Sequence, residues 1–236
     1  MNQELWTAVD RYITELLVSP DQVLEAALQT SAAAGLPPIN VAPNQGKLLQ
    51  LLATMQGARN ILEIGTLGGY STIWLARALP ADGRLVTLEA EPLHAKTARK
   101  NIARAGLEKI VEVRLGPALD TLKQLVAEKC RPFDLIFIDA DKESYPEYLV
   151  WSLKLSQRGT CIIADNVVRN GAVIDPAHED PRVQGVRRFN ERLAAEPGVT
   201  ATTIQTVGSK GYDGFTLAIV TADPCAIHLS MGADAT

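Results

Sequence analysis

The sequence has few cysteines, histidines and aromatic residues. Of its 236 residues, three are cysteine, three are histidine and 5% are aromatic. The cysteines, Cys130, Cys161 and Cys225, stand at spacings that match no zinc site, and nothing indicates an oxidising compartment. Cys161 lies in an apolar run, so we expect a buried, unpaired side chain there. These counts disfavour a zinc protein and a disulfide-stabilised secreted domain.

Runs of positive charge and long apolar runs are also missing. The net charge is -4 and the sequence pI is about 5.5, which argues against nucleic-acid binding. No stretch approaches the roughly 20 apolar residues that a membrane span needs, and the polar start of the chain does not resemble a signal peptide. We therefore expect a cytoplasmic protein that binds neither membranes nor nucleic acids.

The first 56 residues read as helical. Apolar residues recur at helical spacing from Leu5 to Leu17. Ser19-Pro20-Asp21 predicts a new helix with Ser19 as its cap and proline in its first turn, and residues 43–55 predict a third helix. With no internal repeat or low-complexity linker, we expect one domain: a helical segment (1–56), a core (57–221) and a loose tail (222–236).

After residue 57, short apolar runs alternate with helical segments. The predicted strands are 60–64, 84–89, 110–115, 133–139 and 159–165, and the predicted helices between them are 71–79, 92–105, 118–129 and 145–155. This alternation predicts an α/β fold with a buried parallel sheet and helices on both faces. A helix at 182–195 precedes two more runs, 200–207 and 215–221, which predict a hairpin at the sheet edge.

A glycine-rich loop follows the first predicted strand and opens a helix. It reads EIGTLGGYS (63–71), so Gly65 and Gly69 can adopt conformations with positive φ close to a ligand. A dinucleotide loop needs G-x-G-x-x-G, and here the second glycine is misplaced. S-adenosylmethionine (SAM) fits better, with Glu63 as an acceptor near its ammonium group. A bare structural turn is the remaining alternative.

Glu89 closes the second predicted strand, more than 20 residues after the glycines. An acidic residue at this position can accept both hydroxyls of an adenosine ribose. It can equally cap the next helix or lie in solvent. Its pairing with Glu63 and the glycines favours the ribose role.

Carboxylates and an amide gather at the ends of the fourth and fifth predicted strands. Asp139 ends one strand, and Asp165 and Asn166 end the other. Neighbouring strands lie about 4.8 Å apart, so these side chains can converge. The oxygen-only set suits Mg²⁺ or Ca²⁺, and no histidine or cysteine joins it, which counts against Zn²⁺. The alternative, that each aspartate only caps a helix, is weakened by their joint presence beside Lys142.

At these residues the sequence closely resembles the cation-dependent O-methyltransferases of the catechol and caffeoyl-coenzyme A type. The shared blocks are LEIGTLGGYST (62–72), LVTLEAEP (85–92), GPAL (116–119), FDLIFIDADKESYPEYL (133–149) and IIADNVV (162–168). The resemblance covers roughly residues 35–220. It implies a Rossmann-like sheet of seven strands and a Mg²⁺-dependent, SAM-dependent methylation of a catechol-like hydroxyl.

The resemblance also implies roles for single residues. Asp139, Asp165 and Asn166 match the metal ligands, and Lys142 matches the catalytic lysine that takes the substrate proton. The matches to cofactor-binding positions are the backbone at Val41, Glu63, Gly65, Gly69, Ser71, Glu89, Ala118 and Asp139. Leu67 and Ala140-Asp141 depart from the mammalian catechol enzymes and are closer to the plant and bacterial branch, which is usually dimeric. We therefore expect a homodimer.

The acceptor region is the least defined by the sequence. By the resemblance, residues 169–183 and 208–214 line the acceptor pocket, and Asp213 is the candidate to hold a second hydroxyl. Lys142 would accept the proton with a depressed pKa, or else only pair with the phenolate. An NAD-dependent oxidoreductase and a non-catalytic SAM-binding protein are the competing classes. The misplaced glycine speaks against the first, and the intact set of Asp139, Lys142, Asp165 and Asn166 against the second.

Overall fold

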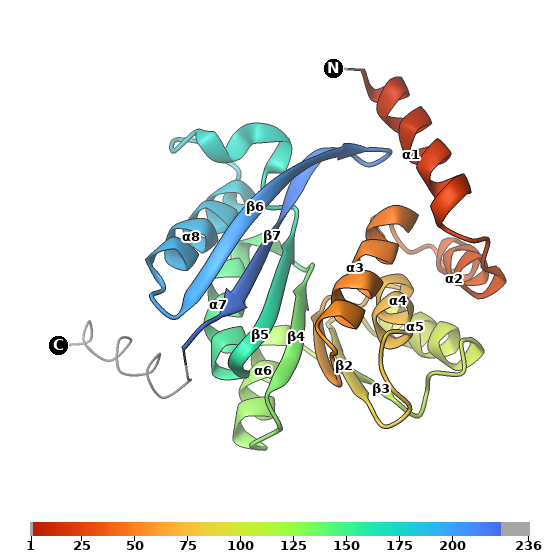
Figure 1. The fold of residues 1–236 in the computed structure, drawn as a ribbon, viewed down its shortest axis with the longest axis horizontal. Helices are drawn as coiled ribbons and strands as arrows, with labels where there is room; N and C mark the ends of the chain where they lie inside the picture. The colour runs from red at the N-terminus through yellow and green to blue at the C-terminus, as the bar shows by residue number, and fades with distance from the viewer. Residues whose placement is uncertain (1, 223–236) are drawn as a thin grey trace. The chain divides into compact units, whose positions relative to one another are not determined.

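The computed structural model describes residues 2–222 and has an α/β fold around a seven-stranded sheet (Figure 1). The strands are β1 (Asn60–Ile64), β2 (Arg84–Glu89), β3 (Val111–Leu115), β4 (Phe133–Ile138), β5 (Ser156–Asp165), β6 (Val199–Gly208) and β7 (Gly211–Val220). Their order is β3-β2-β1-β4-β5-β7-β6. β1 and β3 each pair with β2 in parallel, β4 pairs with β5 in parallel, and β7 pairs with β5 antiparallel. The predicted mostly parallel sheet with a C-terminal hairpin is confirmed.

The helices follow the predicted pattern with small differences at their ends. They are α1 (Gln3–Leu17), α2 (Gln22–Ala33), α3 (Pro43–Met55), α4 (Tyr70–Ala76), α5 (Pro92–Arg104), α6 (Ala118–Ala127), α7 (Tyr145–Lys154) and α8 (Pro181–Ala195), with 3₁₀ turns η1 (Lys142–Ser144) and η2 (Arg169–Ile174). The prediction that Ser19 caps the second helix is wrong. Asp21 caps it instead, because its carboxylate accepts from the amides of Val23 and Leu24, both at 3.0 Å.

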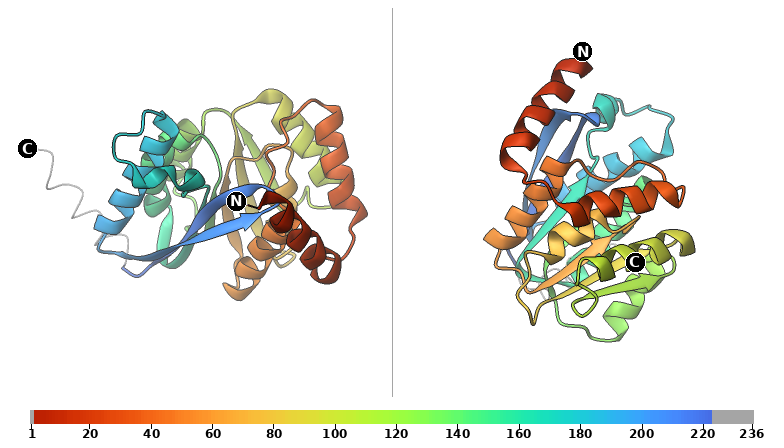
Figure 2. Two further views of the ribbon diagram at one scale, coloured as in Figure 1. Left: turned by 90° about the horizontal axis from the view of Figure 1, so that it is seen from above. Right: turned by 90° about the vertical axis from the view of Figure 1, so that its right-hand side faces the viewer.

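The chain divides into two compact units, and the first comprises residues 1–121 and 207–211. In this unit α4 and α5 pack on the strands, and α2 and α3 pack on α4 and α5. The tip of the β6–β7 hairpin lies beside α1 (Figure 2), where the Ser209 amide donates to Asp10 at 2.7 Å and the Gln3 amide group donates to the Gly208 carbonyl at 2.9 Å. Residues 60–64 are all buried, as expected for a strand covered on both faces.

The second unit comprises residues 122–206 and the described residues from 212 on. Helix α7 packs on β4 and β5, and α8 packs on α7, η1 and η2. The rings of Tyr145 and Phe189 meet edge to face with centroids 5.6 Å apart, and both side chains are fully buried. Gly185 lets α8 approach η1, because a Cβ there would lie 2.2 Å from the Lys142 carbonyl oxygen.

Residues 2–222 also bear on the predictions about cysteine burial, membrane spans and domain organisation. Cys161 is buried, as expected, and burial raises the pKa of its thiol to about 11. None of the helices in the described part of the chain is long and apolar enough to cross a membrane. The predicted tail from residue 223 on, with Cys225, lies outside the described residues. The single-domain organisation stays a prediction.

Candidate active site

The glycine-rich loop after β1 is shaped by residues with positive φ. Gly65, Leu67 and Gly69 have φ values of 100°, 50° and 82°, so the two glycines occupy conformations that other residues rarely adopt. Gly69 is the N-cap residue of α4. A Cβ at Gly68 would lie 2.0 Å from the Ser31 hydroxyl oxygen, so α2 closes over the loop at this point. The prediction that these glycines allow unusual backbone conformations is confirmed.

Glu63, at the end of β1, is fully buried and surrounded by hydroxyl groups. Its carboxylate accepts from Ser71 at 2.6 Å, from Thr87 at 2.7 Å and from Thr72. Three hydroxyl donors satisfy a buried charge that would otherwise be costly. Glu63 therefore fixes the start of α4 and orients Ser71. The role of Glu63 as an acceptor near a bound ligand stays a prediction.

Glu89 ends β2 and faces the same loop. Its carboxylate accepts from the Leu67 amide at 2.7 Å and from the Glu91 amide at 2.9 Å, and His94 lies 3.5 Å away. The Glu91 contact at the start of α5 matches the capping alternative. The Leu67 contact ties Glu89 to the glycine loop, as the ligand-binding alternative requires. Each carboxylate oxygen can accept a further hydrogen bond, so the two roles are compatible.

Two other candidate cofactor positions belong to the same unit. The Gly116 amide donates to the Glu89 carbonyl at 2.9 Å, which brings the segment before α6, and so Ala118 at its first residue, to the end of β2. Val41 is buried in the segment before α3, and its carbonyl oxygen accepts from the Asn40 side chain at 3.0 Å. Glu63, Gly65, Gly69, Ser71, Glu89 and Ala118 thus lie on three adjacent strand ends.

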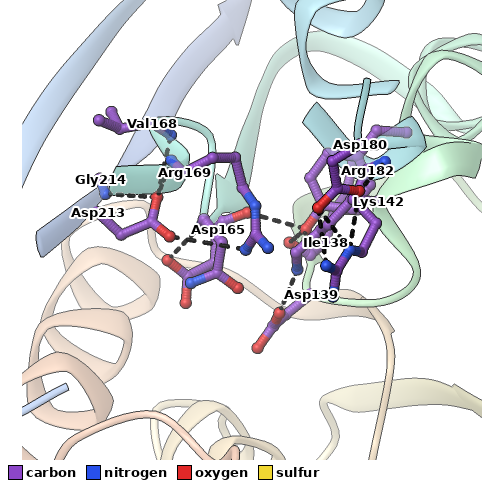
Figure 3. A network of polar contacts seen from close by, with 12 residues as sticks. Ile138, Asp139, Lys142, Asp165, Val168, Arg169, Asp180, Arg182, Asp213 and Gly214 are labelled. Atoms are coloured by element: carbon purple, nitrogen blue, oxygen red, sulfur yellow. Dashed lines mark hydrogen bonds and ion pairs between the residues drawn. The ribbon is translucent and has the colours of Figure 1, made fainter. Parts of the chain in front are cut away.

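The predicted metal ligands lie at or directly after the ends of β4 and β5, and Figure 3 shows two of them, Asp139 and Asp165. Ile138 pairs with Ala164, so Asp139 and Asp165 follow at the same level of neighbouring strands. Asn166 comes next with φ of 56°, which turns the chain sharply after the strand. Asp165 is buried, and its Oδ1 accepts from the Asn166 amide at 2.8 Å. The predicted convergence at this sheet edge is consistent with this register.

The donor set has the chemistry of a hard-cation site. Within residues 2–222, no group of three or more histidine, cysteine, aspartate or glutamate side chains is arranged to hold a metal ion. The candidate set instead combines two carboxylates with one amide oxygen. Such a set fits Mg²⁺, which keeps several water or substrate ligands, and does not fit Zn²⁺.

Lys142 lies in η1, directly beside Asp139. Its Nζ donates to Asp139 Oδ1 and to the Tyr145 hydroxyl oxygen, each at 2.8 Å, and the side chain is buried. Burial alone lowers the pKa of Lys142, but the Asp139 carboxylate and Tyr145 raise it more, so the net pKa is above its ordinary value. The expected depression is therefore not produced by the protein's own groups. They favour a charged Lys142.

Tyr145 is a site residue that the sequence analysis missed. Its ring is fully buried, and its hydroxyl lies within hydrogen-bond distance of the carbonyl oxygens of Asp165 (2.9 Å) and Ile138 (3.2 Å). Burial raises the pKa of Tyr145, so it stays protonated. It thereby links the ends of β4 and β5 to Lys142. The available signal was its position three residues after Lys142, at a helix start.

Asp213 holds the backbone of the loop after β5, a contact that the sequence did not predict. Its Oδ1 accepts from the amides of Val168 at 3.0 Å, Arg169 at 2.9 Å and Gly214 at 3.0 Å. Its Oδ2 lies 3.8 Å from an Arg169 guanidinium nitrogen. Because three donors occupy Oδ1, Asp213 fixes the loop that follows Asn166. The role of Asp213 toward an acceptor hydroxyl stays a prediction, because Oδ2 takes part in none of these hydrogen bonds.

Comparisons with known proteins agree on one family. The family model described as O-methyltransferase matches residues 15–220. A catechol O-methyltransferase of Niastella koreensis is 57% identical over 220 residues, which cover 93% of this chain and 100% of the relative, and one of Mycobacterium tuberculosis is 51% identical, covering 90% and 94%. An O-methyltransferase of Bacillus cereus solved in complex with SAH superposes with a TM-score of 0.92 at 63% identity, covering 93% of this chain and 100% of the other. An O-methyltransferase of Streptomyces achromogenes, solved in complex with SAM, gives a TM-score of 0.91 at 55% identity, covering 94% and 100%.

Proposed function

The chain belongs to the O-methyltransferase family, and we propose that it transfers the methyl group of SAM to one hydroxyl of a catechol-like acceptor held on Mg²⁺ or a similar divalent cation. The observation that carries the proposal is that Asp139 and Asp165 directly follow the paired residues Ile138 and Ala164 on neighbouring strands, with the Lys142 ammonium 2.8 Å from Asp139. Relatives named as catechol O-methyltransferases support the acceptor class, and solved relatives with SAM or SAH support the methyl donor.

Asp139, Asp165 and Asn166 would hold the cation through oxygen atoms. A phenolic hydroxyl has a pKa near 10, as tyrosine does, so little phenolate exists at neutral pH. The cation, when bound, lowers that pKa and orients two adjacent oxygens of the acceptor. Two adjacent hydroxyls can both coordinate, which fixes the attacking oxygen more firmly than one can.

Lys142 would either stabilise the negative charge of the reacting oxygen or accept its proton. Held by Tyr145 and Asp139, its ammonium stays on one side of the ligand set. In the charged form, which the protein's own groups favour, it stabilises the phenolate electrostatically. To accept the proton instead, it needs a lower pKa. A cation bound to Asp139 would weaken the interaction that raises the pKa of Lys142, and would therefore lower that pKa.

The residues of the first unit would bind the methyl donor. The Glu89 carboxylate has remaining acceptor capacity for ribose hydroxyls, and the loop of Gly65 and Gly69 allows close approach of a ligand to the backbone. Ser71, oriented by Glu63, offers a hydroxyl at the first turn of α4. Val41 and Ala118 complete this proposed set.

Removal of the cation tests the proposal. We expect excess EDTA to abolish methylation of a catechol, and Mg²⁺ to restore it, because the proposed ligands are all oxygen atoms. Asp165→Ala should remove most turnover and most Mg²⁺ affinity while SAH affinity, measured by calorimetry, stays close to wild type. Asp141→Asn is the matched control, since Asp141 belongs to the same segment but pairs with Tyr148. Full activity in EDTA would refute the metal assignment.

A further inference from the structure

The loop after β5 holds Arg169 in an unusual backbone conformation. Arg169, Asn170 and Gly171 have φ values of 55°, 55° and 82°, three consecutive left-handed residues of which two carry side chains. Such residues persist where their surroundings fix them, and they concentrate at functional sites. Here Asp213 fixes the loop by accepting from the Val168 and Arg169 amides. The loop begins three residues after the proposed metal ligand Asn166.

The Arg169 side chain is mostly enclosed but poorly paired. It is 23% exposed, and its Nε atom is buried without a hydrogen-bond partner. Within residues 2–222 its ion pair with Asp213 Oδ2 is 3.8 Å long, which is too long for a hydrogen bond, and it also interacts electrostatically with Asp180. In the view of Figure 3, the guanidinium group lies between Asp165 and Lys142. A buried donor without an acceptor is costly, so its presence calls for an explanation.

Three of the neighbouring acids have hydrogen-bond partners other than Arg169. Asp213 Oδ1 accepts three backbone amides, and Asp139 accepts from Lys142. Asp180 pairs with both Nε and a terminal nitrogen of Arg182 at 2.7–3.1 Å. The Nε atom of Arg169 therefore keeps a donor for an anion that is not part of these contacts. Lys142, beside the proposed cation ligands, would interact with the reacting oxygen. Arg169 is therefore better matched to a second anionic group of the acceptor.

We propose that Arg169 selects acceptors that carry a carboxylate in addition to the two adjacent hydroxyls. This inference rests on the proposed function. A guanidinium group pairs with a carboxylate through two parallel hydrogen bonds, which gives direction as well as affinity. Asp213 is then a positioning residue, because it sets the loop conformation from which Arg169 extends.

Paired acceptors test the inference without any change to the protein. With SAM and Mg²⁺, 3,4-dihydroxybenzoate is compared with 3,4-dihydroxybenzamide, and 3,4-dihydroxycinnamate with its amide, because the two pairs place the carboxylate at different distances from the hydroxyls. We expect the wild-type enzyme to prefer the acid in at least one pair by about 10- to 100-fold in kcat/KM, mainly through KM. Equal or lower values for both acids would overturn the inference.

Variants then assign the preference to Arg169. Arg169→Gln should remove the acid preference and leave the amides within about threefold of wild type, and Arg169→Lys should restore only part of it. Arg182→Gln is the matched control, since Asp180 occupies its guanidinium, and it should keep the preference. Calorimetry of 3,4-dihydroxybenzoate with the SAH- and Mg²⁺-loaded protein should show the same loss of affinity for Arg169→Gln, and thermal melting checks the folding of this variant.

If Arg169→Gln lowers kcat/KM for the acid and the amide alike, Arg169 acts on the shared catechol and the inference fails. If no catechol is methylated at all, the proposed function itself fails.

Discussion

Glu63 and Glu89 end neighbouring strands, yet their carboxylates have different surroundings. Hydroxyl groups of the protein enclose Glu63 completely, whereas Glu89 receives two backbone amides at the edge of the glycine loop. A carboxylate saturated by the protein positions other groups, and one with unused lone pairs can also bind a ligand. The sequence pattern does not reveal this difference in surroundings, since both residues are acids near strand ends.

Replacement of Glu89 separates its two possible roles. We expect Glu89→Ala to weaken SAH binding by about 1–3 kcal/mol, the scale of a lost hydrogen bond to a charged group. Glu89→Gln, which keeps an acceptor oxygen, should lose less. Isothermal calorimetry gives both values. Unchanged affinity in Glu89→Ala would mean that Glu89 only caps α5 and supports the loop.

Among the elements, the segment from Asn166 to Ile174 is held by contacts with residues far away in the sequence. Asp213, on β7, accepts hydrogen bonds from the amides of Val168 and Arg169, which are 45 and 44 positions away in the chain. Tyr145, at the start of α7, joins the ends of β4 and β5 in a similar way. Both residues connect elements that carry the proposed cation ligands and Lys142.

Loss of the Asp213 carboxylate should loosen this loop. Asp213→Ala leaves the amides of Val168 and Arg169 without their acceptor, so we expect about 1–3 kcal/mol lower stability in chemical denaturation. Hydrogen exchange should accelerate at residues 168–171, and the KM of the acceptor should rise while SAH affinity is kept. Asp213→Asn retains the Oδ1 acceptor, so its stability and exchange rates should lie between those of the wild type and of Asp213→Ala. Wild-type exchange in Asp213→Ala would show that other contacts hold the loop.

These contacts also show where prediction from sequence succeeds and fails. The bounds of β1, β2 and α3 were predicted correctly, because apolar runs mark the two strands and Pro43 marks the helix start. The start of β5 was placed three residues late. The first residues of β5 include the polar Gln157 and Arg158, which do not form an apolar run, and the β4–β5 register shifts beside them. The roles of Tyr145 and Asp213 could not be predicted, because they arise from contacts that no local pattern records.

On the scale of the whole molecule, α1 has an exposed apolar face. It has no buried residue, and Leu5, Val9, Tyr12 and Leu16 are 46–65% exposed. An apolar face of this kind marks an interaction surface. We therefore keep the proposal of a homodimer, and we expect light scattering to give about twice the chain mass of 25.4 kDa. Replacing Leu5 and Tyr12 by Ser should shift the protein toward the monomer, and a wild-type mass of one chain would refute the proposal.

Chelation of the acceptor by the cation is central to the proposed function. A single phenol occupies one coordination position, is acidified less and is held less firmly, and misplacement of a reacting oxygen by about 1 Å costs on the order of 100-fold in rate. The most direct test is kcat/KM for a catechol and for its mono-hydroxyl analogue, at saturating SAM and Mg²⁺. We expect the catechol to exceed the analogue by at least about 100-fold in kcat/KM. Comparable values for the two acceptors would contradict it.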